Sequence, residues 1–78
     1  MQEVYLIISN YEKRTQVRAV CTKETAVEHY KLMCSCKSEN LIREEIKPYI
    51  TNFYSLNEDG EKVFQEQIYV EKKFVVGS

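Results

Sequence analysis

Two apolar stretches joined by a short turn constrain the fold of this sequence more than any other feature. Residues 49–56 and 61–70 are rich in Tyr, Phe, Ile and Val, and the run between them, 57–60, ends in Gly60. Glycine readily adopts the left-handed backbone conformation that follows a type I turn. The pattern therefore predicts a long β-hairpin with a four-residue loop at its tip.

The predicted hairpin carries apolar side chains on both of its faces. Neighbouring residues of a strand point to opposite sides of a sheet, and a loop over 57–60 places Leu56 opposite Glu61. A single helix covers only one of the two faces. We therefore expect the other face to be exposed, covered by the segment 38–47, or buried by another molecule. The first predicted face carries Tyr49, Phe53, Phe64 and Ile68, and the second carries Ile50, Tyr54, Leu56 and Val63.

The N-terminal part of the chain has the pattern of another hairpin. Residues 3–9 are rich in β-branched and aromatic types with apolar side chains on both sides, which is typical of a central strand. The polar segment 10–15 follows as a turn, and residues 17–22 then alternate as a second strand. The alternating side chains that we expect to point toward the core are Val17, Ala19 and Cys21.

A helix is predicted over residues 22–36. The hydroxyl of Thr22 can accept a hydrogen bond from the first helical turn, and Glu24 suits the positive end of the helix dipole. After the helix we expect one further helical turn within 38–47, which Pro48 ends because proline lacks a backbone donor. The apolar stripe that we expect to lie on the sheet comprises Ala26, Val27, Tyr30, Met33 and Cys34.

Together, these patterns predict one α+β domain that spans residues 1–78. The order of its elements is β-β-α-β-β, in a four-stranded, mostly antiparallel sheet with one helix packed on one face. With 44% hydrophobic and 29% charged residues, the composition is that of an ordered globular chain. Tyr5 and Tyr30 are predicted to lie in the core or at its margin.

Net charge and the N-terminal sequence limit the possible partners. Eleven Lys and Arg against twelve Asp and Glu give a net charge of −1, which provides no long-range field for nucleic acid or an anionic membrane. The N-terminal sequence MQEVYLIIS has too short an apolar run for a signal peptide or a membrane span. An odd number of cysteines cannot all pair, so we expect free thiols and a cytoplasmic location.

Histidine and cysteine residues form no catalytic or metal-binding pattern. His29 lacks a positioned partner for acid–base catalysis, and its combination with Cys21, Cys34 and Cys36 lacks the spacing of a structural zinc site. Cys21 shares the alternation of Val17 and Ala19, so we expect its side chain to be buried. A buried cysteine acts as a small hydrophobic residue. We therefore predict that the protein is not an enzyme and has no cofactor and no metal site.

One short segment approaches a nucleic-acid-binding pattern. Tyr11 is followed by Lys13, Arg14 and Arg18, and aromatic side chains interleaved with basic ones can stack on bases and neutralise phosphates. Glu12 lies within the same segment and dilutes its charge. A polar turn is the simpler interpretation of these residues.

The two predicted N-terminal strands, 4–8 and 17–22, lead through Thr22 into a helix with an early Ala26. This arrangement resembles a diffuse group of small phage and bacterial proteins, in which two strands lead through a Ser or Thr cap into a helix and a further strand follows. The resemblance covers residues 3–36. It implies a small binding protein that blocks or redirects a host protein, and it assigns no functional residue.

We therefore predict a small protein-binding module, encoded by a phage, that acts as a stoichiometric inhibitor or modulator of a host protein in the host cytoplasm. Tyrosine supports this function because it buries its ring and keeps its hydroxyl hydrated, as interface residues do. A homodimeric structural or regulatory protein is the first alternative, and a nucleic-acid-binding module is the second. The predicted partner-binding residues are Ile50, Tyr54, Leu56, Val63, Tyr69 and Tyr11.

Overall fold

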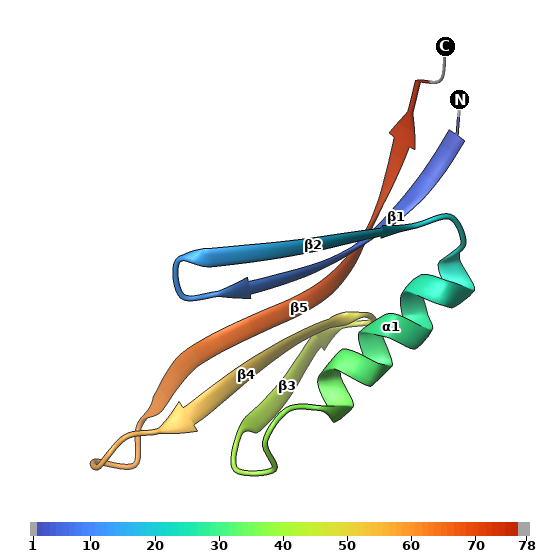
Figure 1. The fold of residues 1–78 in the computed structure, drawn as a ribbon. Coiled ribbons are helices and arrows are strands. Elements are labelled where there is room, and N and C mark those ends of the chain that lie inside the picture. Colours follow the sequence, from blue (N-terminus) through green and yellow to red (C-terminus); the bar gives the residue numbers. More distant parts are fainter. Residues whose placement is uncertain (1, 77–78) are drawn as a thin grey trace.

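The computed structural model describes residues 2–76 as one antiparallel sheet with a helix on one side (Figure 1). The elements are β1 (Gln2–Tyr11), β2 (Arg14–Val20), α1 (Lys23–Ser35), β3 (Ile42–Lys47), β4 (Ile50–Leu56) and β5 (Lys62–Val75). The strands lie in the order β2-β1-β5-β4-β3, and all neighbours are antiparallel. This confirms the predicted α+β class with one helix packed on one face, and it adds a fifth strand.

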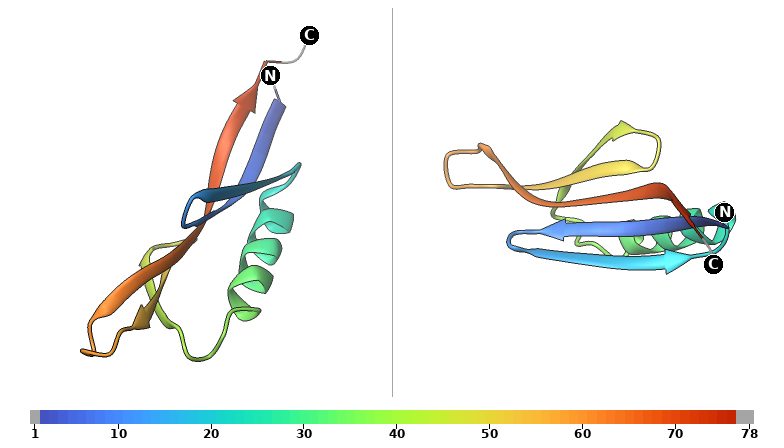
Figure 2. Two further views of the ribbon diagram at one scale, coloured as in Figure 1. Left: turned by 60° about the vertical axis from the view of Figure 1, so that its left-hand side comes forward. Right: turned by 90° about the horizontal axis from the view of Figure 1, so that it is seen from above.

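Helix α1 begins where the capping pattern predicts it. The Thr22 hydroxyl accepts a hydrogen bond from the backbone N–H of Thr25 at 3.2 Å, which satisfies one of the free donors of the first turn. Glu24 lies in that turn, near the positive end of the helix dipole. The helix packs over β1, β2 and β5, so it covers one side of the sheet only (Figure 2).

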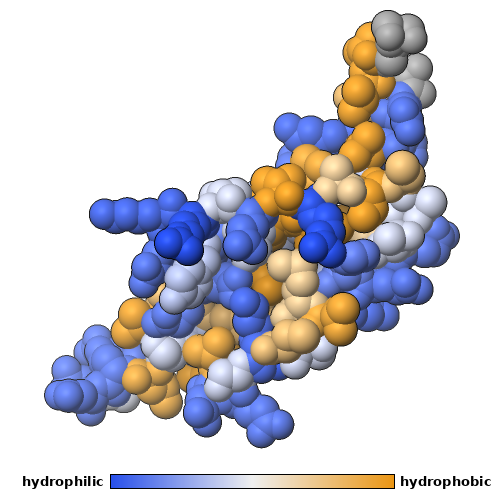
Figure 3. All heavy atoms as spheres, in the orientation of Figure 1, coloured by the Kyte–Doolittle hydropathy of each residue, from blue (hydrophilic) through white to orange (hydrophobic). Residues whose placement is uncertain are grey.

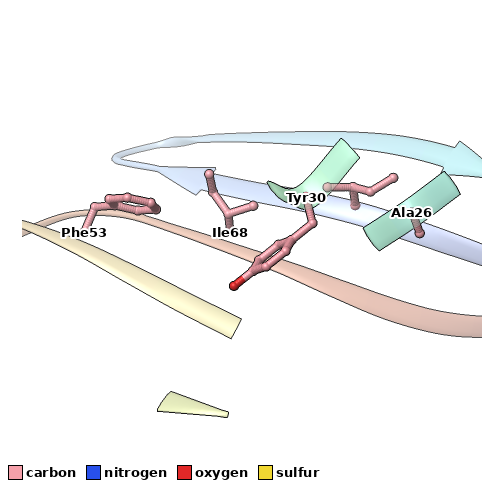
Figure 4. Packing of buried hydrophobic residues seen from close by; sticks show 5 residues of the cluster. Ala26, Tyr30, Phe53 and Ile68 are labelled. Atoms are coloured by element: carbon pink, nitrogen blue, oxygen red, sulfur yellow. The ribbon is translucent and has the colours of Figure 1, made fainter. Parts of the chain in front are cut away.

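The hydrophobic core lies between α1 and the middle of the sheet. It is formed by Ile7 from β1, Ala26 and Tyr30 from α1, Phe53 from β4 and Ile68 from β5 (Figure 4). Tyr30 is therefore a core residue, as predicted. Partly buried side chains that pack against this cluster are Tyr5, Val20, Met33, Cys34, Leu41, Tyr49 and Val70.

The segment 38–47 is a strand over most of its length, so the prediction of a helical turn there is wrong. Residues 42–47 pair antiparallel with β4, from Ile42 opposite Tyr54 to Lys47 opposite Ile50. This segment carries charged side chains between two isoleucines and has little apolar alternation of its own. Its conformation follows from backbone hydrogen bonds to the neighbouring strand.

The loop between β4 and β5 is one residue longer than predicted. Leu56 lies opposite Lys62, so the loop comprises residues 57–61. The side-chain carbonyl of Asn57 accepts from the backbone N–H groups of two later loop residues, at 3.0 and 2.8 Å. Gly60 has a φ of 79°, the left-handed conformation expected for it. The longer loop shifts the register by one residue.

A bulge in β5 shifts the register again. Tyr54 lies opposite Phe64 and Phe53 lies opposite Glu66, so Gln65 has no partner on β4. An extra residue of this kind bends the strand and increases its twist. The cross-strand pairs predicted by simple counting are therefore wrong along the whole hairpin.

The new register also corrects the predicted faces. Phe64 lies beside Tyr54 on the side of the sheet away from α1, with the two rings 6.0 Å apart and nearly perpendicular. Val63 lies opposite Ser55 and therefore on the helix side, beyond the end of α1. The two residues have exchanged the faces that counting assigned to them.

Strand β2 shows the opposite phase from the one predicted. Val17 lies opposite Ile8 and Ala19 opposite Leu6, on the side away from α1, and both Val17 and Ala19 are exposed. Cys21 follows the strand and is exposed rather than buried. The helix side of β2 carries long polar side chains in their place, because α1 lies mainly over β1 and β5.

The molecule is elongated, with extents of 54 × 23 × 19 Å. Strands β1 and β5 pair from Gln2 with Val75 down to Tyr11 with Glu66, and their outer part extends beyond α1 and the other strands (Figure 1). Figure 3 shows hydrophobic side chains along this projecting ribbon. Phe74 and Val75 are among the exposed hydrophobic residues there.

Candidate functional site

The side of the sheet opposite α1 is not covered by any element of the described chain, residues 2–76. We call it the open face. Cross-strand partners share a side of the sheet, so the strand pairings identify its members. Its apolar side chains are Val4, Leu6, Ile8, Val17, Ala19, Ile42, Ile50, Tyr54, Leu56, Phe64, Tyr69 and Val75.

A continuous apolar row crosses the open face at right angles to the strands. Val17 on β2 lies opposite Ile8 on β1, Ile8 opposite Tyr69 on β5, and Tyr69 opposite Ile50 on β4. Ile8 is only 6% exposed although α1 lies on the other side, since its row neighbours flank it on both sides. Four strands therefore present one apolar band.

A second apolar row lies nearer the β4–β5 loop. Phe64, Tyr54 and Ile42 are consecutive cross-strand partners on β5, β4 and β3. The ammonium group of Lys62 lies 5.6 Å from the centre of the Tyr54 ring, close enough for a cation–π contact. Leu56 extends this row toward the loop and is exposed.

Uncharged polar side chains separate the two apolar rows. The Gln67 amide donates to Oδ1 of Asn52 at 2.9 Å, and the Asn52 amide donates to the Tyr54 hydroxyl at 3.1 Å. On the neighbouring strands, the Thr15 hydroxyl donates to Oδ1 of Asn10 at 2.9 Å. These bonds hold the side chains of the open face in fixed orientations, which reduces the entropy lost when a partner binds.

Four of the six predicted partner-binding residues lie together on the open face: Ile50, Tyr54, Leu56 and Tyr69. The other two do not join them. Val63 lies on the helix side of β5, and Tyr11 lies on the helix side of β1, opposite Arg14 and Glu66. The predicted set therefore does not form one surface.

Sequence reasoning missed other members of the open face. Ile8 and Val17 complete the first row and Phe64 completes the second. The alternation within residues 3–9 identifies Ile8 as one side of a central strand, but not which side α1 covers. Phe64 follows only from the loop length and the bulge, and no local pattern reports either.

The cysteine and histidine side chains lie apart from the open face. Cys21 and Cys36 are exposed and Cys34 is half-buried beside the core. Nδ1 of His29 lies 3.2 Å from a guanidinium nitrogen of Arg18, so the neighbour of the imidazole is an arginine and not a thiol. Within residues 2–76, His, Cys, Asp and Glu side chains form no group of three that could hold a metal ion.

Cys34 should react more slowly than the two exposed thiols. Burial raises the pKa of the Cys34 thiol, and a hydrogen bond with Tyr30 opposes this shift only in part. The thiolate is the reactive form, so burial slows reaction through both access and ionisation. Iodoacetamide treatment at mildly alkaline pH, followed by peptide mapping, should modify Cys21 and Cys36 before Cys34. In urea the three rates should converge, and equal rates in the native protein would contradict this assignment.

A buried carboxylate forms a separate polar cluster on the helix side. Glu66 accepts a hydrogen bond from the Ser9 hydroxyl at 2.5 Å and pairs with the Lys37 ammonium group at 2.5 Å. A cavity of about 240 Å³ beside them is also lined by Arg14 and Gln16. Because Lys37 and Ser9 already occupy both oxygens of the carboxylate, the cluster is suited to holding the sheet and the helix–β3 connection together.

Neither protein-family models, nor curated proteins, nor solved structures gave a match to this chain. The resemblance of residues 3–36 to small phage and bacterial proteins therefore stays a prediction. None of the helices within residues 2–76 has the length and apolar character needed to cross a membrane.

Proposed function

We propose that the protein is a stoichiometric protein-binding module whose open face contacts the partner. The observation that carries this proposal is the pair of apolar rows on a sheet face that the described chain leaves uncovered. Contiguous apolar surface exposed beside ordered polar groups is the usual composition of an interface centre and its rim.

The charges of the open face favour a protein partner over nucleic acid. Lys47, Lys62 and Lys73 lie on this face together with Glu44 and Glu71, and Lys62 pairs with Glu44 at 3.6 Å. Such a balanced surface gives a phosphate backbone little attraction. The matching partner is a flat apolar protein surface with hydrogen-bonding groups opposite the Asn and Gln side chains.

The size of the molecule is compatible with this function. A standard protein interface buries roughly 800 Å² on each partner. The whole protein exposes 5908 Å², so such an interface uses a modest share of its surface. The resemblance to small phage and bacterial proteins supports a host protein as the partner and inhibition as the consequence of binding.

Two adjacent residues on β5 provide a matched test. Phe64 on the open face is 50% exposed and Val63 on the helix side is 41% exposed, so glutamate is tolerated at both positions. Phe64→Glu places a charge in the second apolar row and should abolish partner binding. Val63→Glu adds the same charge next to it and should leave binding unchanged. Both variants should keep the circular dichroism spectrum of the wild type.

The measurement has two stages. Proteins retained from a host lysate by the wild type and by Val63→Glu, but not by Phe64→Glu, are candidates, and calorimetry with the purified candidate then gives the affinity and stoichiometry. Equal retention by both variants would contradict the proposal. A wild-type dimer in sedimentation equilibrium that Phe64→Glu dissociates would also contradict it, because the open face would then be a homodimer interface.

A further inference from the structure

The two edges of the sheet differ in how they are protected. At β3, the register shifts between Glu45 and Lys47, and Pro48 follows directly. Bulges, charges and proline are features that prevent an edge strand from pairing with another chain. Strand β2 has neither a bulge nor a proline, since it pairs without a register shift from Arg14 to Val20. Its outer backbone groups are regularly spaced and have no strand partner within residues 2–76.

A groove runs beside β2 on the helix side. It has a volume of about 460 Å³ and lies between β2 and the exposed flank of α1. Ile7 is buried at its base, and Leu32 and Met33 contribute apolar surface from α1. The arrangement of a free strand edge beside a groove and a helix is the one in which an extended peptide adds to a sheet and inserts alternate side chains.

Basic side chains border this groove. Arg14, Gln16 and Arg18 alternate along the helix side of β2, and His29 lies against Arg18. Neither arginine forms an ion pair within residues 2–76, and the nearby Glu66 carboxylate is already bound by Lys37. Figure 3 shows strongly hydrophilic side chains beside hydrophobic ones on this side of the molecule.

We propose that β2 and this groove bind an extended acidic peptide segment of a partner protein as a sixth strand. On the helix side, carboxylates of the segment lie opposite Arg14 and Arg18, and an apolar side chain opposite Gln16 enters the groove toward Leu32. On the open face, small apolar residues of the segment lie next to Val17 and extend the first apolar row. The backbone supplies affinity, and the arginines select the acidic segment.

A second copy of the chain fits this edge less well. Antiparallel pairing of β2 with its own copy about Val17 places Arg18 opposite Gln16 of the second copy. Arg14 then lies diagonally next to the second copy's Arg18, and all four guanidinium groups share one side of the sheet. Like charges at this spacing disfavour the pairing, whereas an acidic segment neutralises them.

The probe is a blocked, fluorescein-labelled peptide whose core reads Glu-Val-Leu-Val-Glu, compared with Lys-Val-Leu-Val-Lys. Its palindromic core fits parallel and antiparallel addition equally. Fluorescence anisotropy should show saturable binding of the acidic peptide that weakens with salt, and no binding of the basic one. Two N-methylated forms of the acidic peptide test strand addition. One form carries N-methyl groups on the two valines, and the other carries them on the two glutamates and the leucine. One pattern should abolish binding and the other should keep it, because alternate amides face the edge.

Charge reversal on the protein locates the site. Arg18→Glu should weaken binding about tenfold or more, which corresponds to losing roughly one charge-assisted contact. Lys31→Glu, on the exposed side of α1, is the matched control and should change little. Phe64→Glu should also bind normally, because the open-face function and this site are separate. That variant therefore distinguishes a failure of the open-face proposal from a failure of the peptide-site proposal.

The proposal is overturned by any of the following results. These are no saturable binding of the acidic peptide up to its solubility limit, equal binding of both peptides, equal binding of both N-methylated forms, or equal loss with Lys31→Glu. Displacement of the acidic peptide by a short single-stranded oligonucleotide that binds more tightly would also overturn it. The arginines would then form a phosphate site.

Discussion

Replacing Phe53 by alanine should lower the free energy of unfolding by about 3–5 kcal/mol. Phe53 is 0% exposed and is the largest fully buried side chain within residues 2–76. Its ring contacts the core beneath α1, and the guanidinium group of Arg43 lies 5.6 Å from the ring centre. A chain of this length is expected to be stable by only roughly 4–12 kcal/mol, so the substitution should remove a large fraction of the total stability.

Phe64→Ala is the matched control for this prediction. Phe64 is the same residue type in the same hairpin, but half of it is exposed on the open face. Its removal should cost only about 1 kcal/mol, because the side chain gives up less buried apolar area. Urea unfolding followed by circular dichroism measures both values. Similar losses in the two variants would show that the two faces are buried alike, which would remove the basis of the proposed function.

The sequence predicts the elements of this fold better than their pairing. Thr22 and the apolar stripe locate α1, and the two hairpins follow from alternation and turn residues. These signals are local, since each element carries its own cap or period. The register of β4 against β5 depends on a loop residue and on the bulge at Gln65, and both are settled by packing across strands.

Strand β3 shows where local signals end. Its sequence, IREEIK, has no apolar face and carries two adjacent carboxylates. An edge strand needs only one hydrogen-bonded neighbour, and charged side chains protect its free side. The conformation of β3 is therefore decided by β4, which pairs with it across the turn at Pro48. The helical turn predicted for 38–47 relied on local signals alone, and these do not include the pairing with β4.

The candidate site was predicted in part for the same reason. The surplus of apolar side chains on the β4–β5 hairpin follows from composition, and Ile50, Tyr54, Leu56 and Tyr69 do lie on one face. Counting also assigned Val63 to that face, but the register of the structure places it on the helix side. The edge groove beside β2 was not predicted at all, because the phase of Val17 depends on where α1 lies over the sheet.

The polar cluster at Glu66 gives the second large effect. Glu66 is buried and Lys37 is 29% exposed, with their charged groups 2.5 Å apart. The ion pair connects β5 to the segment between α1 and β3. Removing one partner of a buried pair leaves an uncompensated charge, and this costs more than the pair itself contributes.

Lys37→Met should therefore lower the free energy of unfolding by about 3 kcal/mol, because it leaves the Glu66 carboxylate with the Ser9 hydroxyl alone. Lys62→Met, which breaks the exposed pair with Glu44, is the matched control and should cost less than about 1 kcal/mol. In the double variant Lys37→Met/Glu66→Leu, most of the lost stability should return, because no charge remains buried. Urea unfolding of these three variants and of Glu66→Leu alone measures this non-additivity. Additive losses at Lys37 and Glu66 would mean that the two side chains stabilise the fold independently, and the pair would then not connect the helix–β3 segment to the sheet.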